Sequence, residues 1–225
     1  IELSEAGLIG TVDDSDGKTY KWVRIGNQYW MAENLAYLPS VNLLNDVSGT
    51  VPCYYVYDYD GTDIAAARAS ANYQTYGVLY NWPAATAACP AGWHLPTDDE
   101  WMEMENFLVL NGFNYDGTAS DDKIAKSLAT ASGWTPSSNE GAVGNNDFPY
   151  KQNSSGFSAL PGGFRYAGGT LDGVYKQSKW WTNTKFSSSG EYYLYYLRYY
   201  YSNLNHYGYS PDCGNSVRCI KDNGQ

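Results

Sequence analysis

Histidine is the side chain most often used for metal binding and for proton transfer near neutral pH, and this chain has only two, His94 and His206. A metal site built on two or three histidines is therefore not expected. A serine hydrolase would also need a histidine base, and the Gly-x-Ser-x-Gly sequence that presents its nucleophile does not occur. We predict no catalytic centre, no bound metal and no cofactor.

Acidic residues form three groups that resemble calcium loops or paired catalytic carboxylates. Residues 14–17 and 58–63 look like parts of an EF-hand, but the twelfth position holds Ile25 in one and Ala69 in the other instead of glutamate. Residues 98–100 stand at a predicted helix start, where acidic side chains favourably meet the helix dipole. Each group has a structural explanation, so we predict no calcium site.

The stretch from Tyr192 to Tyr209 contains nine tyrosines among eighteen residues. If residues 191–201 form a strand, tyrosines occupy both of its faces and cannot all be buried. One interpretation is a tyrosine-rich sheet stabilised by aromatic pairs across strands. The other is a binding surface, because tyrosine supplies large contact area while asparagine and serine supply adaptable hydrogen bonds. For that surface we predict the contact residues Trp181, Tyr195, Tyr199, Tyr201, Asn203, Asn205, His206, Tyr207 and Tyr209.

The composition excludes two classes of partner. The formal charge of −10 and the pI near 4.5 oppose binding to nucleic acid, where lysine and arginine must replace counterions. No apolar run approaches the ~20 residues that a membrane helix needs. We expect neither a nucleic-acid partner nor a membrane span.

Four cysteines in a lysine-poor chain indicate an oxidising compartment. They allow three disulfide pairings, which the sequence alone leaves open. The chain begins at Ile1 without methionine, which leaves room for a signal peptide or a lipid anchor upstream. We predict a secreted protein or one on the bacterial outer surface.

One helix has complete start and stop signals. Thr97 and Glu100 form a capping box, and they predict a helix over Asp98–Leu110 that ends at Asn111-Gly112. Its buried stripe is expected to contain Trp101, Met104, Phe107 and Leu108. This helix should be the main element that positions the rest of the chain.

The remaining signals are weaker and predict an α+β arrangement with one domain over residues 10–222, a leader at 1–9 and a tail at 223–225. An Asp-Gly turn joins the first two strands, the second over residues 20–25. A short helix capped by Thr62 is predicted over 63–70, and a second main helix over 123–132. The predicted later strands are residues 29–35, 76–82, 156–165, 180–182, 191–201 and 216–221.

Seven segments, taken in order, carry a family resemblance: residues 14–20, 25–35, 76–82, 89–97, 156–165, 180–181 and 216–222. Together they resemble the Fibrobacter succinogenes major paralogous domain, which is found in secreted and surface proteins of Bacteroidetes and Fibrobacteres. The resemblance covers about residues 10–222. It implies a C-type-lectin-like fold, related to the formylglycine-generating enzyme, with two main helices, antiparallel strands and long loops. It implies no defined activity.

The lectin-like resemblance also implies a disulfide pairing, Cys89 with Cys219 and Cys53 with Cys213. In the formylglycine-generating enzyme two cysteines near the C-terminus bind copper, and residues 213–219 superficially resemble that pair with one extra residue between them. A bonded Cys219 would have no thiolate for a metal. Calcium-dependent sugar binding of the lectin type would need tripeptides that this chain lacks.

We therefore expect a non-enzymatic, secreted or surface-anchored binding module whose ligand is a protein or a glycan. The stretch Tyr192 to Tyr209 also resembles the variable region of lectin-fold proteins that retroelements diversify. The alternatives are a structural adhesin or pilus-tip subunit and, less favoured, a copper oxidase similar to the formylglycine-generating enzyme.

Overall fold

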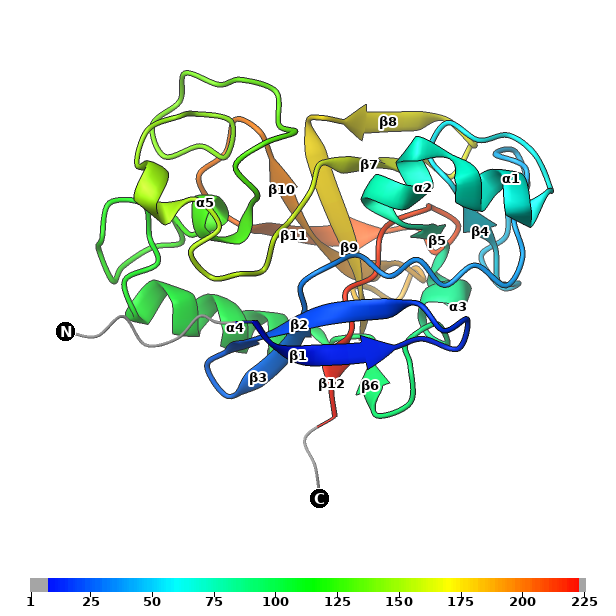
Figure 1. Cartoon of the computed structure of the whole chain (residues 1–225), viewed down its shortest axis with the longest axis horizontal. Coiled ribbons are helices and arrows are strands. Elements are labelled where there is room, and N and C mark those ends of the chain that lie inside the picture. Colours follow the sequence, from blue (N-terminus) through cyan, green and yellow to red (C-terminus); the bar gives the residue numbers. More distant parts are fainter. Residues whose placement is uncertain (1–7, 223–225) are drawn as a thin grey trace.

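The structure, a computed structural model, describes residues 8–222 and is α+β, as expected (Figure 1). The helices among these residues are α1 (Ile64–Ala69), α2 (Ala71–Tyr76), α3 (Trp82–Ala85), α4 (Asp98–Leu110), α5 (Ala125–Leu128) and the 3-10 turn η1 (Pro149–Lys151). Long loops connect them to three sheets.

The first sheet holds both the first and the last described strand, in the order β1-β2-β3-β12-β6. Its strands are β1 (Leu8–Asp13), β2 (Thr19–Ile25), β3 (Gln28–Met31), β12 (Ile220–Lys221) and β6 (Trp93–His94). Ile220 pairs with Trp30 on one side and with His94 on the other, so the two ends of the domain are tied together. The first strand begins at Leu8, before the expected boundary at Gly10. The rest of the expected leader and tail lies outside the described residues.

The second sheet has the order β11-β10-β9-β7-β8. Its strands are β7 (Gly162–Arg165), β8 (Leu171–Val174), β9 (Gln177–Lys185), β10 (Tyr192–Arg198) and β11 (Asn205–Tyr209). The pair β7 and β9 is parallel and the other neighbours are antiparallel. A small third sheet pairs β4 (Tyr54–Tyr55) with β5 (Leu79–Tyr80).

Helix α4 confirms the prediction made from its capping signals. Thr97 Oγ1 accepts the Glu100 N–H at 3.2 Å, and a Glu100 carboxylate oxygen accepts the Thr97 N–H at 2.8 Å. The helix ends at Leu110, Asn111 is its C-cap, and Gly112 follows with a φ of +80°. Trp101, Met104 and Leu108 are fully buried, while Phe107 packs at the edge of the same cluster.

Two other predicted helices differ from the structure. The predicted helix over 123–132 shrinks to α5, because Ala129 leaves helical geometry and pairs with Ala159. The side chain of Gln152 donates to the carbonyls of Ala129 and Thr130, which holds them in the extended form. The cap of α1 is Asp63 and not Thr62, since the Asp63 carboxylate accepts the first helical N–H groups.

The strand predicted over 76–82 is reduced to two residues in the structure. Helix α2 runs to Tyr76, and only Leu79–Tyr80 forms a strand. Gly77 separates the two with a φ of +78°, and a Cβ there would lie 2.6 Å from the Leu35 carbonyl oxygen. The close approach of Gly77 to the Leu35 backbone, which only glycine permits, has no signal in the local sequence.

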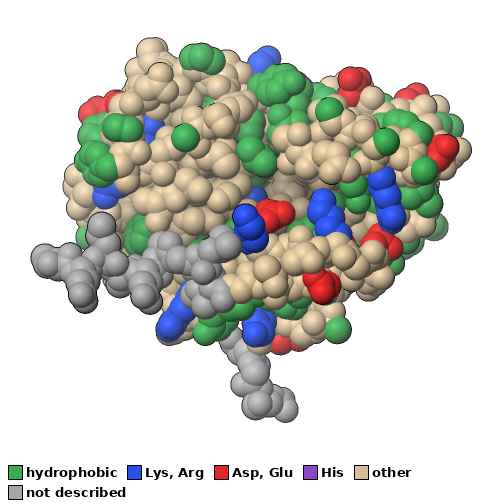
Figure 2. All heavy atoms as spheres, in the orientation of Figure 1, with side chains coloured by type: hydrophobic (Ala, Val, Ile, Leu, Met, Phe, Trp, Pro, Cys, Tyr) green, Lys and Arg blue, Asp and Glu red, His purple; other side chains and the backbone are tan. Residues whose placement is uncertain are grey.

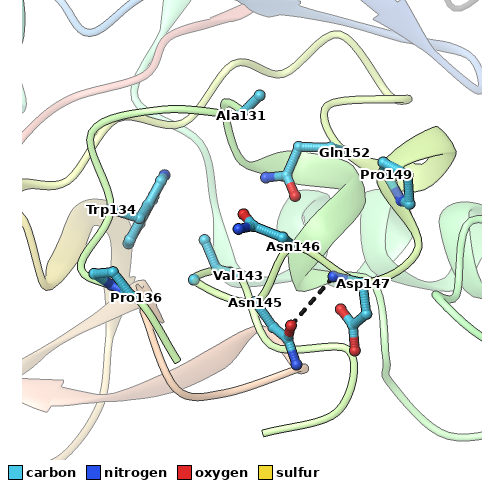
Figure 3. Close-up of a pocket in the computed structure, with 10 residues that line it drawn as sticks. Ala131, Trp134, Pro136, Val143, Asn145, Asn146, Asp147, Pro149 and Gln152 are labelled. Carbon is cyan, nitrogen blue, oxygen red and sulfur yellow. Dashed lines mark hydrogen bonds between the residues drawn. The ribbon is translucent and has the colours of Figure 1, made fainter. Parts of the chain in front are cut away.

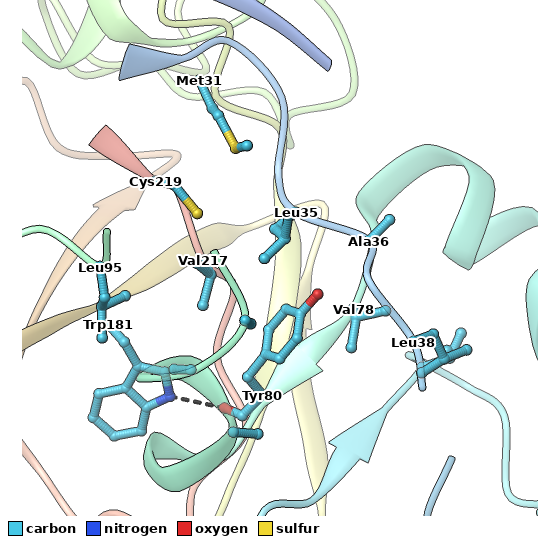
Figure 4. Packing of buried hydrophobic residues seen from close by; sticks show 14 of the residues in the cluster. Met31, Leu35, Ala36, Leu38, Val78, Tyr80, Leu95, Trp181, Val217 and Cys219 are labelled. Atoms are coloured by element: carbon cyan, nitrogen blue, oxygen red, sulfur yellow. Dashed lines mark hydrogen bonds between the residues drawn. The ribbon is translucent and has the colours of Figure 1, made fainter. Parts of the chain in front are cut away.

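Two large buried clusters lie on the two faces of the second sheet. One contains Trp181 and Leu194, with side chains from the first sheet and from α1 to α3 (Figure 4). The other contains Trp180 and Tyr195 with the buried face of α4. Because neighbouring residues of a strand point to opposite faces, the Trp180-Trp181 pair serves both clusters.

Basic and acidic side chains are interspersed over the face shown in Figure 2 and form no single charged patch there. None of the helices in the described part of the chain has the length and apolar character that a bilayer crossing requires.

Candidate functional site

The tyrosine-rich stretch forms the hairpin β10–β11 at the edge of the second sheet. The sequence predicted only the first strand of this hairpin, over residues 191–201. Its register pairs Tyr193 with Gly208 and Tyr195 with His206, so these side chains share one face. Leu194 pairs with Tyr207 on the other face. β9 covers the inner edge of β10, and β11 is the outermost strand, so exposure increases from β10 to β11.

Two of the predicted contact residues are corrected to core residues. Trp181 is fully buried and donates its indole N–H to the Tyr80 carbonyl at 2.8 Å (Figure 4). Tyr195 is 1% exposed and stacks on Trp101 with ring centroids 4.7 Å apart. Both lie on strands with neighbours on each side, where a large aromatic ring packs against the elements above the sheet.

Four aromatic side chains remain accessible at the end of the hairpin next to the β9–β10 turn. We call Phe186, Tyr193, His206 and Tyr207 the hairpin surface. Phe186 lies 4.9 Å from Tyr193 and 5.2 Å from Tyr207 between ring centroids, and Tyr193 stacks on His206 at 5.5 Å. Tyr207 is 58% exposed. The hairpin surface is therefore a continuous set of aromatic rings of which His206 and Tyr207 were predicted.

Gly208 is what allows the rings to pack so closely. A Cβ at this position would lie 2.1 Å from the Phe186 ring, so only glycine lets Phe186 lie across the edge strand. Phe186 was not among the predicted contact residues. Its position depends on the β9–β10 turn and has no local sequence signal.

A second group of tyrosines occupies the opposite end of the hairpin, at the turn that follows β10. The rings of Tyr199, Tyr200 and Tyr201 contact one another in sequence, with centroids 4.9 and 4.4 Å apart. Arg198 donates to the Tyr200 hydroxyl at 3.0 Å, and this hydrogen bond lowers the pKa of Tyr200. The backbone carbonyl of Tyr199 accepts the N–H of Gly144 at 2.8 Å, so a neighbouring loop holds this turn.

The remaining predicted contact residues, Asn203, Asn205 and Tyr209, are half-buried and form hydrogen bonds with neighbouring side chains. Asn203 donates to the side-chain oxygen of Asn205 at 3.2 Å, which closes the turn. Tyr209 accepts a hydrogen bond from the buried Lys179 at 3.0 Å. Burial lowers the pKa of Lys179 to about 7, and its ammonium group lies 3.2 Å from the centre of the Phe164 ring. The contacts of Asn203, Asn205 and Tyr209 therefore stabilise the hairpin itself.

Titratable groups line the face of the hairpin that packs on α4. The Tyr195 hydroxyl donates to Asp98 at 2.9 Å, and His206 Nδ1 lies 3.2 Å from the same hydroxyl oxygen. Burial raises the pKa of Glu105, and the negative charge of Asp98 adds to this while the charge of His206 opposes it. Burial also raises the pKa of Asp122 to about 7, and Glu105 raises it further. None of these carboxylates was singled out as interacting in the sequence.

His94 has a structural position in the loop before α4. Its Nε2 lies 2.8 Å from Glu100, and its Nδ1 lies 2.6 Å from Asp222. Burial alone would lower the pKa of His94, but the hydrogen bonds to Asp222 and Glu100 outweigh it and raise the pKa. The histidine thus connects the helix cap to the end of β12. Across residues 8–222, no group of three or more His, Cys, Asp or Glu side chains is placed to hold a metal ion.

The structure confirms one expected disulfide and corrects the other. Cys89 and Cys219 are bonded, with Cα atoms 5.8 Å apart. Cys53 and Cys213 are separate buried thiols. The segment 80–82 lies between them, because the Asn81 N–H donates to the Cys53 carbonyl and the Trp82 N–H donates to the Pro211 carbonyl. Two strand spacings amount to about 9.6 Å, beyond the roughly 4.4–6.8 Å that a disulfide spans between Cα atoms.

Two buried arginines hold loops together and were missed in the sequence. Arg165 donates to the carbonyls of Leu44, Asp46 and Asp212. Arg218 donates to the Asn34 side chain at 2.9 Å and to backbone carbonyls. Burial lowers the pKa of Arg218 to about 9. Because their partners are carbonyls far away in the chain, no local pattern predicts these contacts.

Comparison with known proteins gives one match. No curated protein and no solved structure matches the chain. The model of the Fibrobacter succinogenes major domain matches residues 23–221, which is most of the chain and includes the whole second sheet with the hairpin surface. The chain belongs to the Fibrobacter succinogenes major domain family.

Proposed function

We propose that this chain is a non-catalytic binding module that recognises a protein ligand through the hairpin surface. The observation that carries the proposal is the series of ring contacts from His206 to Tyr193, to Phe186 and to Tyr207 at the outer edge of the second sheet. Aromatic rings that are fixed by each other lose little side-chain entropy when they bind, and tyrosine is enriched among residues that dominate protein interfaces.

The state of the two C-terminal cysteines favours a binding role over copper oxidase activity. Cys219 is bonded to Cys89, and Cys213 is buried. Copper ligation by both C-terminal cysteines would need two accessible thiolates. The same disulfide favours a working place outside the cytoplasm, and we propose that the protein is secreted or displayed on the bacterial surface.

Two finer features belong to the same proposal. We propose a C-type-lectin-like fold, supported by the disulfide from the start of α4 to the last strand and by the sheet that joins both ends of the domain. We also propose that the hairpin β10–β11 is the variable part among related proteins. Its outer side chains can change without loss of the core, because the buried Leu194, Tyr195, Leu197 and Leu204 anchor the hairpin.

A protein-array screen with the purified chain tests the proposal. Bacterial and host surface proteins form the array, and the affinity of each hit is then measured with single variants. Tyr207→Ala should weaken binding at least about tenfold, the cost of truncating an interface anchor. Tyr150→Ala is the matched control, since Tyr150 is 71% exposed and lies outside the hairpin.

Circular dichroism and thermal unfolding of both variants establish that they remain folded. If Tyr207→Ala binds every hit as tightly as the unmodified protein, the hairpin surface is not the contact face. A structural subunit that only assembles with neighbouring chains would then be the better description.

A further inference from the structure

A pocket of about 240 Å³ lies in the loops that follow α5 (Figure 3). Trp134 and Pro136 line one side, and Asn146 and Gln152 stand opposite (Figure 3). The pocket and the hairpin surface share no residue. Its volume is below the roughly 300 Å³ at which pockets for drug-sized ligands begin, so it suits a ligand of a single ring.

Trp134 gives the pocket an aromatic side with an unused hydrogen-bond donor. Its indole N–H is buried and has no hydrogen-bond partner among the described residues. Buried tryptophan N–H groups are normally paired, so after a small turn of the ring this one can donate to a ligand oxygen without losing a bond inside the protein. The exposed Asn146 adds an amide that points toward the middle of the pocket (Figure 3).

The polar side is held in place by contacts beneath it. Lys126 is fully buried, donates to the Asn145 carbonyl at 2.5 Å and lies 3.0 Å from Asp147 Oδ1. This ion pair encloses Asp147 Oδ1, which solvent does not reach. The other Asp147 oxygen accepts the Gly141 N–H at 2.8 Å, which fixes the carboxylate, and its second lone pair can accept a ligand hydroxyl.

Gln152 is fixed in the same way. Its amide nitrogen donates to the carbonyls of Ala129 and Thr130 at 2.9 and 2.8 Å. Its oxygen lies 3.5 Å from the buried ammonium group of Lys126. Side chains that are already oriented cost little further ordering when a ligand binds.

The charge of the pocket limits the ligand class. The carboxylate of Asp147 is balanced by the ammonium of Lys126. Among the described residues that line the pocket, none is lysine or arginine, so a phosphate or carboxylate ligand would find no cation. A neutral ligand with an apolar ring face and several hydroxyls matches the aromatic side, the indole donor and the carboxylate acceptor together.

We infer that this pocket binds one neutral pyranose unit, with its C–H face against Trp134 and its hydroxyls on Asp147 and Asn146. The site does not depend on the hairpin surface, and each can be tested without the other.

Nuclear magnetic resonance of the full chain provides the test. The indole N–H signal of Trp134, assigned by its disappearance in Trp134→Phe, is followed while glucose, galactose, mannose or N-acetylglucosamine is added. At least one sugar should shift this signal with a Kd on the order of 1 mM, as expected for a single-ring ligand. Methyl glycosides of the same sugars distinguish the end of a glycan chain, which they mimic, from a free sugar.

Three variants sharpen the assignment. In Trp134→Ala the affinity for the sugar, followed on the Asn146 amide signal, should fall at least about tenfold. In Asn146→Ala the affinity, followed on the Trp134 signal, should fall by a smaller factor. Tyr207→Ala is the control and should bind the sugar unchanged. The inference is wrong if none of the four sugars shifts the Trp134 signal at about 100-fold the expected Kd, or if Trp134→Ala binds the sugar as tightly as the unmodified chain.

Discussion

The same residue type has two roles in the hairpin, and the difference is set by one strand position. Tyr195 lies on β10, where α4 covers it and Trp101 stacks on its ring. Tyr207 lies one strand further out, where no further strand of the sheet follows, and it is 58% exposed. A tyrosine count could therefore predict a surface, but it could not say which tyrosines form it.

Asp122 makes a prediction about pH. Burial raises the pKa of its carboxyl group to about 7, and the charge of Glu105 adds to the effect. An unfolded aspartate loses its proton at about pH 4. Between these values the folded state holds the extra proton, and stability falls with pH wherever the folded state binds more protons. The free energy of unfolding should therefore decrease as pH rises from about 4 to about 7.

Urea unfolding at several pH values measures this decrease. Asp122→Asn cannot ionise, so its unfolding free energy should fall less steeply over the same range, whatever its absolute stability. Asp121→Asn is the control, since Asp121 is exposed and should keep the slope of the unmodified protein. Parallel curves for Asp122→Asn and the unmodified protein would show that Asp122 does not carry the pH dependence.

At the scale of elements, α4 was predictable because its signals are local. The capping box, the stripe of buried side chains and the closing glycine all lie within residues 97–112. Helix α5 was predicted too long because Gln152 and Ala159, far along the chain, draw its end into an extended form. The strands β6 and β12 have two residues each and are defined by their pairing, β6 with β12 and β12 also with β3.

The cap of α4 predicts a measurable loss of stability. Thr97→Ala removes the hydroxyl that accepts the Glu100 N–H, and such a change should lower the unfolding free energy by about 1 kcal/mol. Thr97→Ser keeps an oxygen in the same place and should recover most of the loss. Urea unfolding of both variants measures the difference. Equal losses in the two variants would mean that the Thr97 methyl group, and not the cap, is responsible.

At the scale of the whole molecule, the candidate site could be predicted only as a stretch of sequence. The residues that complete the hairpin surface and the pocket, such as Phe186 and Trp134, come from loops whose positions depend on the sheets. The buried Lys126 and Arg218 show the same limit, because their partners lie 19 residues away or further in the sequence. Family resemblance supplied what local patterns could not, namely the link between Cys89 and Cys219.

The disulfide and the two buried thiols together predict how all four cysteines react with a thiol reagent. Cys89 and Cys219 are 130 residues apart, and closing a loop of this length stabilises the fold by about 5 kcal/mol in the loop-entropy description. Cys53 and Cys213 are buried thiols, and burial raises the pKa of Cys213, so neither should react in the folded protein.

A thiol reagent should therefore detect no cysteine in the native chain, two cysteines in urea and four in urea after reduction. Cys53→Ser with Cys213→Ser should abolish the two thiols seen in urea and leave the Cys89–Cys219 bond intact. A count of zero in urea without reductant would instead mean that Cys53 and Cys213 are joined. The segment 80–82, which separates them here, would then have to lie elsewhere, and with it the Tyr80 carbonyl that holds Trp181 in the core.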